Sequence, residues 1–158
     1  MKKILSILSM ILLSGHIVLA DNQTDAIAFF NSYVEAANSY SQEIPNFYSP
    51  NARIIRQVIK PDGELVDRET DMTRYISEMK KGQAAAKLRK YKNNYSDISA
   101  TKINDTTFKV NALRQPSGEM YKLKTYMIVQ KQPDGKWLIT EEMMQTKVQT
   151  FLRYADKQ

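Results

Sequence analysis

Tyrosine, carboxylate and basic side chains supply the chemistry that this sequence offers. The chain has no cysteine, and its one histidine, His16, lies in an apolar leader that we expect to be removed. A chain without His and Cys cannot build a Ser-His-Asp or Cys-His nucleophile, nor a zinc site of the usual Cys/His type. Because no carboxylates recur at calcium-loop spacing, we expect neither a metal nor another cofactor.

Two adjacent carboxylates, Glu141 and Glu142, lie on the last predicted strand. Neighbouring residues of a strand point to opposite faces, so one of them faces inward and the other outward. An inward carboxylate can act as a general acid or base, and we select Glu141 for the ligand-facing position. The alternative is an ion pair on the sheet surface with a lysine of a neighbouring strand.

Tyrosines are the second group of candidate ligand-binding residues, because each offers an apolar ring with a polar tip. The alternative is that these rings fill a core and touch no ligand. The four selected positions are Tyr33, Tyr48, Tyr95 and Tyr126.

A basic cluster is the strongest charge feature of the chain after residue 20. It could bind an anionic membrane surface or an acidic protein, whereas an exported protein rarely meets nucleic acid. The alternative is a solvated helix end and an edge strand whose lysines discourage aggregation. We refer to the following six residues as the basic cluster: Lys80, Lys81, Lys87, Arg89, Lys90 and Lys92.

The first 20 residues have the pattern of a secretory signal peptide. Lys2 and Lys3 precede an apolar run, and Ala20 ends it with a small residue. The run is shorter than the roughly 20 apolar residues that an uncleaved membrane anchor needs. We therefore predict cleavage before Asp21, export to the periplasm or beyond the cell, and a single domain over residues 21–158.

The remaining sequence predicts helices first and strands later. Apolar residues recur at helical spacing over residues 25–41, with Thr24 as N-cap. They recur again from Met72, with Thr70 or Asp71 as N-cap, until Gly82 ends the helix. A short helical turn lies between them, followed by a hairpin of strands 52–59 and 64–66. From residue 87, turns at 104–105, 116–118 and 133–135 separate four antiparallel strands. The predicted class is α+β, with three helices, a short hairpin and a four-stranded meander.

This order of elements resembles the nuclear transport factor 2-like fold. Residues 32–38 (SYVEAAN) and 47–52 (FYSPNA) are similar to the first helix and the helix-to-strand passage of ketosteroid isomerases and polyketide cyclases. The resemblance covers nearly all of the chain after residue 20. It implies a curved sheet wrapped around helices as a cone with an apolar pocket, and relatives that often form homodimers through the sheet.

The resemblance also sets the functional expectation. The oxyanion-stabilising tyrosine of the isomerases falls on Tyr33, but their general-base aspartate falls on Arg56, or on Gln57 if the alignment slips by one. An arginine stays protonated and cannot abstract a proton. We expect an exported, non-catalytic protein that holds a small apolar or amphipathic, lipid-like molecule or docks on an envelope protein. The alternative is a lyase or isomerase of the polyketide-cyclase type that uses Tyr33 and Glu141.

Overall fold

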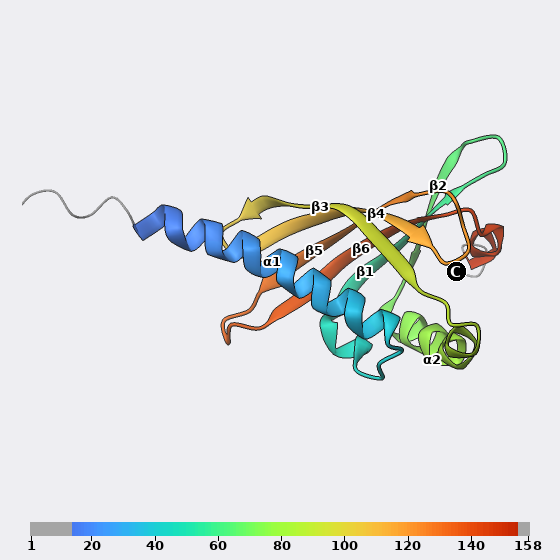
Figure 1. Cartoon of the computed structure of the whole chain (residues 1–158), viewed down its shortest axis with the longest axis horizontal. Helices are drawn as coiled ribbons and strands as arrows, with labels where there is room; N and C mark the ends of the chain where they lie inside the picture. The colour runs from blue at the N-terminus through green and yellow to red at the C-terminus, as the bar shows by residue number, and fades with distance from the viewer. Residues whose placement is uncertain (1–13, 155–158) are drawn as a thin grey trace, which may run out of the picture.

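A computed structural model describes residues 14–154, and the side chains of residues 22–152. Figure 1 shows a long helix lying across one face of a curved sheet, with the second helix near one end of the sheet. The elements in chain order are α1 (Ser14–Asn38), the 3-10 helix η1 (Ile44–Phe47), β1 (Tyr48–Ile59), β2 (Leu65–Thr70), α2 (Met72–Leu88), β3 (Asn93–Asn104), β4 (Thr107–Pro116), β5 (Leu123–Lys131), β6 (Trp137–Thr146) and the 3-10 helix η2 (Gln149–Tyr154).

The six strands form one mixed sheet in the order β2-β1-β6-β5-β4-β3. The predicted meander of β3 to β6 is confirmed, because all of its neighbours pair antiparallel. The predicted hairpin is present, because β1 pairs antiparallel with β2. The expectation of a four-stranded sheet is wrong, since β1 also pairs parallel with β6 and the sheet has six strands. The expectation of three helices also needs correction: in the described residues two α-helices flank one short 3-10 helix.

Helix α1 buries the predicted apolar face. Ala26, Phe30 and Tyr33 are almost fully buried and lie four and three residues apart, on one side of the helix. The described part of the helix already runs from Ser14, so Thr24 lies within it and is not its N-cap. Residues 14–23 contain no proline and one glycine, Gly15, so the sequence has no strong signal that would stop the helix before Thr24.

Helix α2 begins where the sequence predicts and ends later. The Asp71 carboxylate accepts a hydrogen bond of 2.8 Å from the Arg74 backbone N–H, as an N-cap does. The predicted end at Gly82 is wrong, because the helix continues to Leu88. A glycine inside a helix costs only about 1 kcal/mol relative to alanine, and the alanines and lysine that follow favour continuation.

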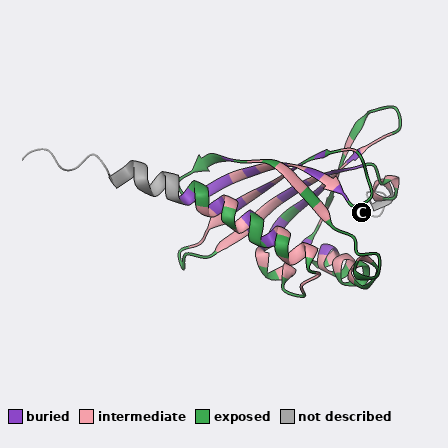
Figure 2. Cartoon of the chain, viewed as in Figure 1, coloured by how far each residue is buried: buried purple, intermediate pink, exposed green. Residues whose placement is uncertain are grey.

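The core lies on the concave face of the sheet, under α1. Phe108, Val110, Met127, Val129 and Ile139 are buried there. Figure 2 shows that buried residues follow the strands where α1 crosses them, whereas α2 and the loop between β1 and β2 are mostly intermediate or exposed. The packed core therefore lies mainly under α1 and also includes the first turn of α2.

The predicted signal peptide lies largely outside this description. Residues 1–13 are outside the described residues, and the predicted cleavage point between Ala20 and Asp21 falls within α1. Cleavage and export stay predictions. None of the helices in the described part of the chain is long and apolar enough to cross a membrane.

Candidate functional site

A cavity of about 540 Å³ lies between the C-terminal end of α1, helix α2 and the concave face of the sheet. Its apolar wall includes Ala37, Ile44, Met79, Ala86 and Phe151. This volume falls within the roughly 300–1,000 Å³ of typical small-molecule sites, which are also mainly apolar with a few polar groups. The cone is therefore open at this end and has room for a ligand.

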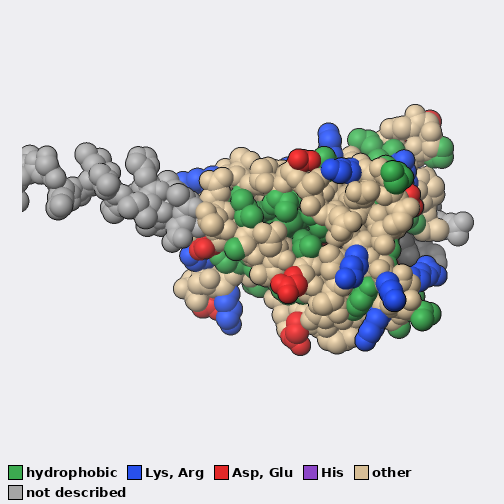
Figure 3. All heavy atoms as spheres, viewed as in Figure 1, with side chains coloured by type: hydrophobic (Ala, Val, Ile, Leu, Met, Phe, Trp, Pro, Cys, Tyr) green, Lys and Arg blue, Asp and Glu red, His purple; other side chains and the backbone are tan. Residues whose placement is uncertain are grey.

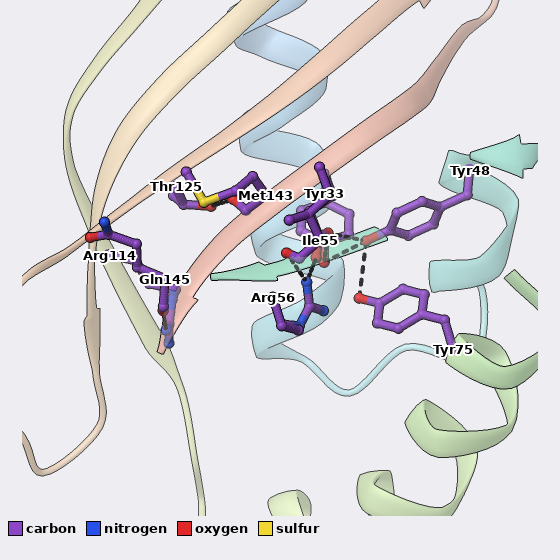
Figure 4. A network of polar contacts seen from close by, with 10 residues as sticks. Tyr33, Tyr48, Ile55, Arg56, Tyr75, Arg114, Thr125, Met143 and Gln145 are labelled. Carbon is purple, nitrogen blue, oxygen red and sulfur yellow. Dashed lines mark hydrogen bonds and ion pairs between the residues drawn. The ribbon is translucent and has the colours of Figure 1, made fainter. Parts of the chain in front are cut away.

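A buried carboxylate, Glu142 of β6, lies next to this cavity. Arg56 Nη1 donates a hydrogen bond of 2.7 Å to Glu142 Oε1. The Tyr48 hydroxyl donates to Oε2, and the Tyr33 hydroxyl lies 3.5 Å from the same oxygen. Figure 4 shows these contacts converging between α1, β1 and β6. Both carboxylate oxygens thus have partners, and the side chain is 0% exposed.

Tyr75 of α2 completes this group of side chains. Its hydroxyl lies 3.2 Å from that of Tyr48, which lies 3.0 Å from that of Tyr33. The guanidinium carbon of Arg56 lies 5.2 Å from the centre of the Tyr75 ring, within cation–π range. We call Tyr33, Tyr48, Arg56, Tyr75 and Glu142 the sealed cluster. It ties both helices to the sheet.

The tyrosines and the arginine of the sealed cluster all have raised pKa values. Burial raises the pKa of Tyr33 and Tyr48 well above the usual tyrosine value, and nearby Glu142 raises the pKa of both further. Burial also raises the pKa of Tyr75. Burial lowers the pKa of Arg56, but Glu142 and the neighbouring tyrosines outweigh this, so its pKa is raised. The tyrosines remain neutral donors, and Arg56 remains a cation that cannot act as a base.

The inward carboxylate is Glu142, so the selection of Glu141 is corrected. The cause is a β-bulge in β6: Ile139 pairs with Val129 and Glu141 with Ile128, which leaves Thr140 as an extra residue. One extra residue reverses the alternation of faces along the rest of the strand. A bulge of this kind has no clear signature in a single sequence.

Glu141 lies on the outer face of the sheet instead. Arg53 Nη1 donates to it at 2.8 Å, and the Tyr126 hydroxyl donates to it at 2.6 Å. Burial and the hydrogen bond to Glu141 raise the pKa of Tyr126 to about 12. Glu141 therefore forms the surface ion pair that was the alternative interpretation, although its partner is an arginine.

The structure brings together only part of the predicted tyrosine set. Tyr33 lines the cavity, and Tyr48 lies behind it within the sealed cluster. Tyr95 belongs to the core, where its ring meets Phe30 edge to face at 5.3 Å. Tyr126 lies on the outer face with Glu141. A role in ligand binding for these residues stays a prediction, and Tyr33 is the one with direct access to the cavity.

The cavity residues that escaped the sequence-based selection include Tyr40, Tyr75 and Arg114. For Arg114 the signal was present, because it follows the inward positions Val110 and Ala112 at the period of a strand. A cation at an inward position is unusual and marks a candidate site. Tyr75 lies at helical spacing on the apolar face of α2, which indicates packing, and its hydroxyl cannot be placed without the fold.

The basic cluster gathers at the cavity end of the molecule, on the second half of α2 and the segment that follows it. Figure 3 shows several basic side chains close together over this end. Lys80 lines the cavity, and all six side chains are exposed. In the described residues no group of His, Cys, Asp and Glu is arranged to hold a metal ion.

Comparison with known proteins shows likeness of structure only. No family model and no curated protein matches the chain. A protein of unknown function from Shewanella oneidensis, described as like nuclear transport factor 2, matches with a TM-score of 0.59 and 15% identity over 78% of this chain and 98% of that chain. A candidate scytalone dehydratase from Novosphingobium aromaticivorans matches with a TM-score of 0.57 and 12% identity, covering 79% and 86%.

A third similar structure is a candidate aromatic ring hydroxylase, also from Novosphingobium aromaticivorans. It matches with a TM-score of 0.57 and 11% identity over 80% of this chain and 89% of that chain. Identities this low show a shared fold and carry no site residue or activity from one protein to another.

Proposed function

We propose that this chain, which has the nuclear transport factor 2-like fold, binds a small amphipathic molecule in its cone cavity without transforming it. The observation that carries the proposal is the separation of the two parts of the site. The cavity is open and mainly apolar, whereas Glu142 is fully buried and does not line it.

A base must reach the proton that it removes, directly or through one water. Both oxygens of Glu142 already accept hydrogen bonds, from Arg56 and Tyr48. By the sequence resemblance, the family's general-base aspartate falls on Arg56 or Gln57, and neither an arginine nor a glutamine can act as that base. Among the described cavity-lining residues no Asp, Glu or His is present, so this wall offers no carboxylate or imidazole as a general base.

Saturable binding of N-phenyl-1-naphthylamine, a neutral amphipathic fluorescent dye, tests the proposal. Ala86 lines the cavity, and the exposed Ala84 on the same helix does not. We expect one dye per chain, with binding reduced at least tenfold in Ala86→Trp because the indole fills the cavity. Ala84→Trp is the matched control and should bind as the wild type does. No saturable binding, or equal binding by both variants, would contradict the proposal.

A lyase of the polyketide-cyclase type is the second candidate. Two of the structural neighbours are candidate enzymes, a dehydratase and a ring hydroxylase. The hydroxyls of Tyr33 and Tyr75 belong to side chains that line the cavity, and neutral tyrosines can donate protons. Mass spectrometry of a bound molecule before and after incubation discriminates the two: a change of mass that Tyr33→Phe abolishes would favour the lyase.

Export is part of the proposal and rests on the sequence of residues 1–20. Its test is the intact mass of the protein recovered from its native host, which we expect to begin at Asp21. A mass that includes residues 1–20 would refute cleavage. Docking of the basic cluster on an anionic membrane or an envelope protein remains the alternative use of this end of the molecule.

A further inference from the structure

Arg114 presents a buried positive charge to the cavity. Its side chain lines the cavity from β4, and the residue is only 4% exposed. Nη1 donates to Asn93 Oδ1 at 2.9 Å and Nη2 to the Gln145 carbonyl oxygen at 2.8 Å, which are both neutral acceptors. Nε is buried and has no hydrogen-bond partner. Within residues 22–152 no salt bridge joins Arg114 to a carboxylate.

The charge of Arg114 has no counterion in the cavity wall. The charged residues among the described lining are Arg56, Lys80 and Arg114, with no Asp or Glu. Glu142 neutralises Arg56 at 2.7 Å, whereas Lys80 is exposed to solvent. Burying a cation without an anion is costly. The free protein therefore retains one unmatched charge beside an apolar cavity.

A second unpaired donor belongs to a residue of the same cavity wall. The Tyr40 hydroxyl is buried without a partner, and Tyr40 lines the cavity. Tyr40 has φ +59° at the end of α1, where the Ser41 N–H bonds the Ala36 carbonyl at 2.9 Å. This helix-ending motif normally takes glycine, so a tyrosine there is strained. Strained residues with unsatisfied polar groups cluster at binding sites.

We propose that the ligand is an amphipathic carboxylate whose head group is bound by Arg114 and the Tyr40 hydroxyl, with its apolar part against the cavity wall. This inference rests on the proposed function and names the ligand class. One unmatched cation suits a monoanion, whereas a phosphate monoester carries a charge of about −1.5 to −2. Arginine is also the side chain best suited to carboxylates.

Three probes with the same alkyl chain test the head-group chemistry: decanoate, 1-decanol and decyl phosphate, each titrated calorimetrically into the full chain at 0.15 M salt. A hydrogen bond to a charged group should make decanoate bind about ten- to a hundredfold more tightly than 1-decanol. We expect decyl phosphate to bind no more tightly than decanoate.

Variants then assign the effect to residues. Arg114→Met should remove the preference for decanoate over 1-decanol. Arg89→Met is the matched control: it removes the same charge from an exposed position of the basic cluster and should alter decanoate binding less than twofold, because salt screens it. Tyr40→Phe should weaken decanoate binding severalfold without lowering the melting temperature, since its hydroxyl has no partner in the free protein.

The outcomes separate this inference from the proposed function. Equal binding of decanoate and 1-decanol would overturn the carboxylate and leave the amphipathic ligand in place. Tighter binding of decyl phosphate would overturn the carboxylate in favour of a phosphate head group. If no probe binds, both the inference and the proposed function are wrong. If Arg114→Met does not fold, the wild-type ratio and Tyr40→Phe still decide the matter.

Discussion

Two arginines line the same cavity, and they differ in whether a carboxylate pairs with their charge. Arg56, on β1, bonds a buried carboxylate and lies over an aromatic ring. Arg114, on β4, bonds only an amide and a backbone carbonyl, and its Nε has no partner. The first arrangement is complete without a ligand, whereas the second lacks an anion.

This difference distinguishes a structural role for Arg56 from a ligand-binding role for Arg114 within the same site. A buried charge that is fully paired holds elements together, and removing either partner is costly. A buried charge that is left unmatched is retained at a cost to stability, which selection tolerates where a ligand supplies the counterion. The sealed cluster is therefore read as structural, and the Arg114 side of the cavity as the binding part.

The largest expected effect is on the sealed cluster. Glu142→Gln leaves Arg56 buried without its counterion, and we expect the free energy of unfolding to fall by about 3–5 kcal/mol. Urea denaturation measures this change. Glu141→Gln is the matched control, because its partner Arg53 is 56% exposed, and should cost at most about 1 kcal/mol. Equal losses in the two variants would contradict the structural role of the sealed cluster.

Alkaline pH should weaken the same cluster. Burial raises the pKa of Tyr48 in the folded state, so below about pH 10 both states hold its proton and stability is unaffected. Above pH 10 the unfolded tyrosine loses its proton first, and stability falls by about 1.4 kcal/mol per pH unit for each such residue. Urea unfolding at pH 10 and 11 should show a decline that is shallower by about this amount in Tyr48→Phe. Identical declines would refute it.

Arg114 should matter less to stability than the sealed cluster. Arg114→Met loses two hydrogen bonds to neutral acceptors but also removes an unmatched buried charge. We expect a net loss of about 1 kcal/mol in urea denaturation. A loss as large as that of Glu142→Gln would show that Arg114 is also structural, and the contrast between the two arginines would disappear.

The smallest expected effect concerns the helical wall of the cavity. A Cβ added at Gly82 meets no atom within 4 Å, and the residue lies inside α2. Gly82→Ala should therefore raise stability by about 0.5–1 kcal/mol, measured as a higher urea midpoint. Dye affinity should stay within twofold of the wild type. A lower midpoint would show that the wall is strained at this position.

Features of the fold that depend on nearby residues could be predicted from the sequence, whereas features that depend on contacts between distant segments could not. The buried face of α1, the Asp71 cap and the turns at Gly118 and Gly135, where φ is +81° and +84°, depend on nearby residues and were predicted. The parallel pairing of β1 with β6 joins segments far apart in the sequence, so periodicity cannot reveal it. The predicted end of α2 failed because packing and neighbouring residues outweigh one glycine.

The site was harder to predict than the fold. Tyr33 was found through the family resemblance, but a bulge at Thr140 exchanged the faces of Glu141 and Glu142. Arg114 was visible as a cation at an inward position of β4, yet its lack of a counterion depends on which residues the fold brings together. Sequence reasoning therefore predicted the fold class but missed Arg114, the buried cation without a counterion in the cavity wall.

Native mass spectrometry of the protein purified from its own cells, followed by extraction of bound molecules, tests the central claim most directly. We expect one small molecule per chain, identified on extraction as an amphipathic carboxylic acid, and its absence from Ala86→Trp but not from Ala84→Trp. A wild-type protein that is empty, or that is recovered with a second polypeptide in place of a small molecule, would contradict the account and indicate docking as the function.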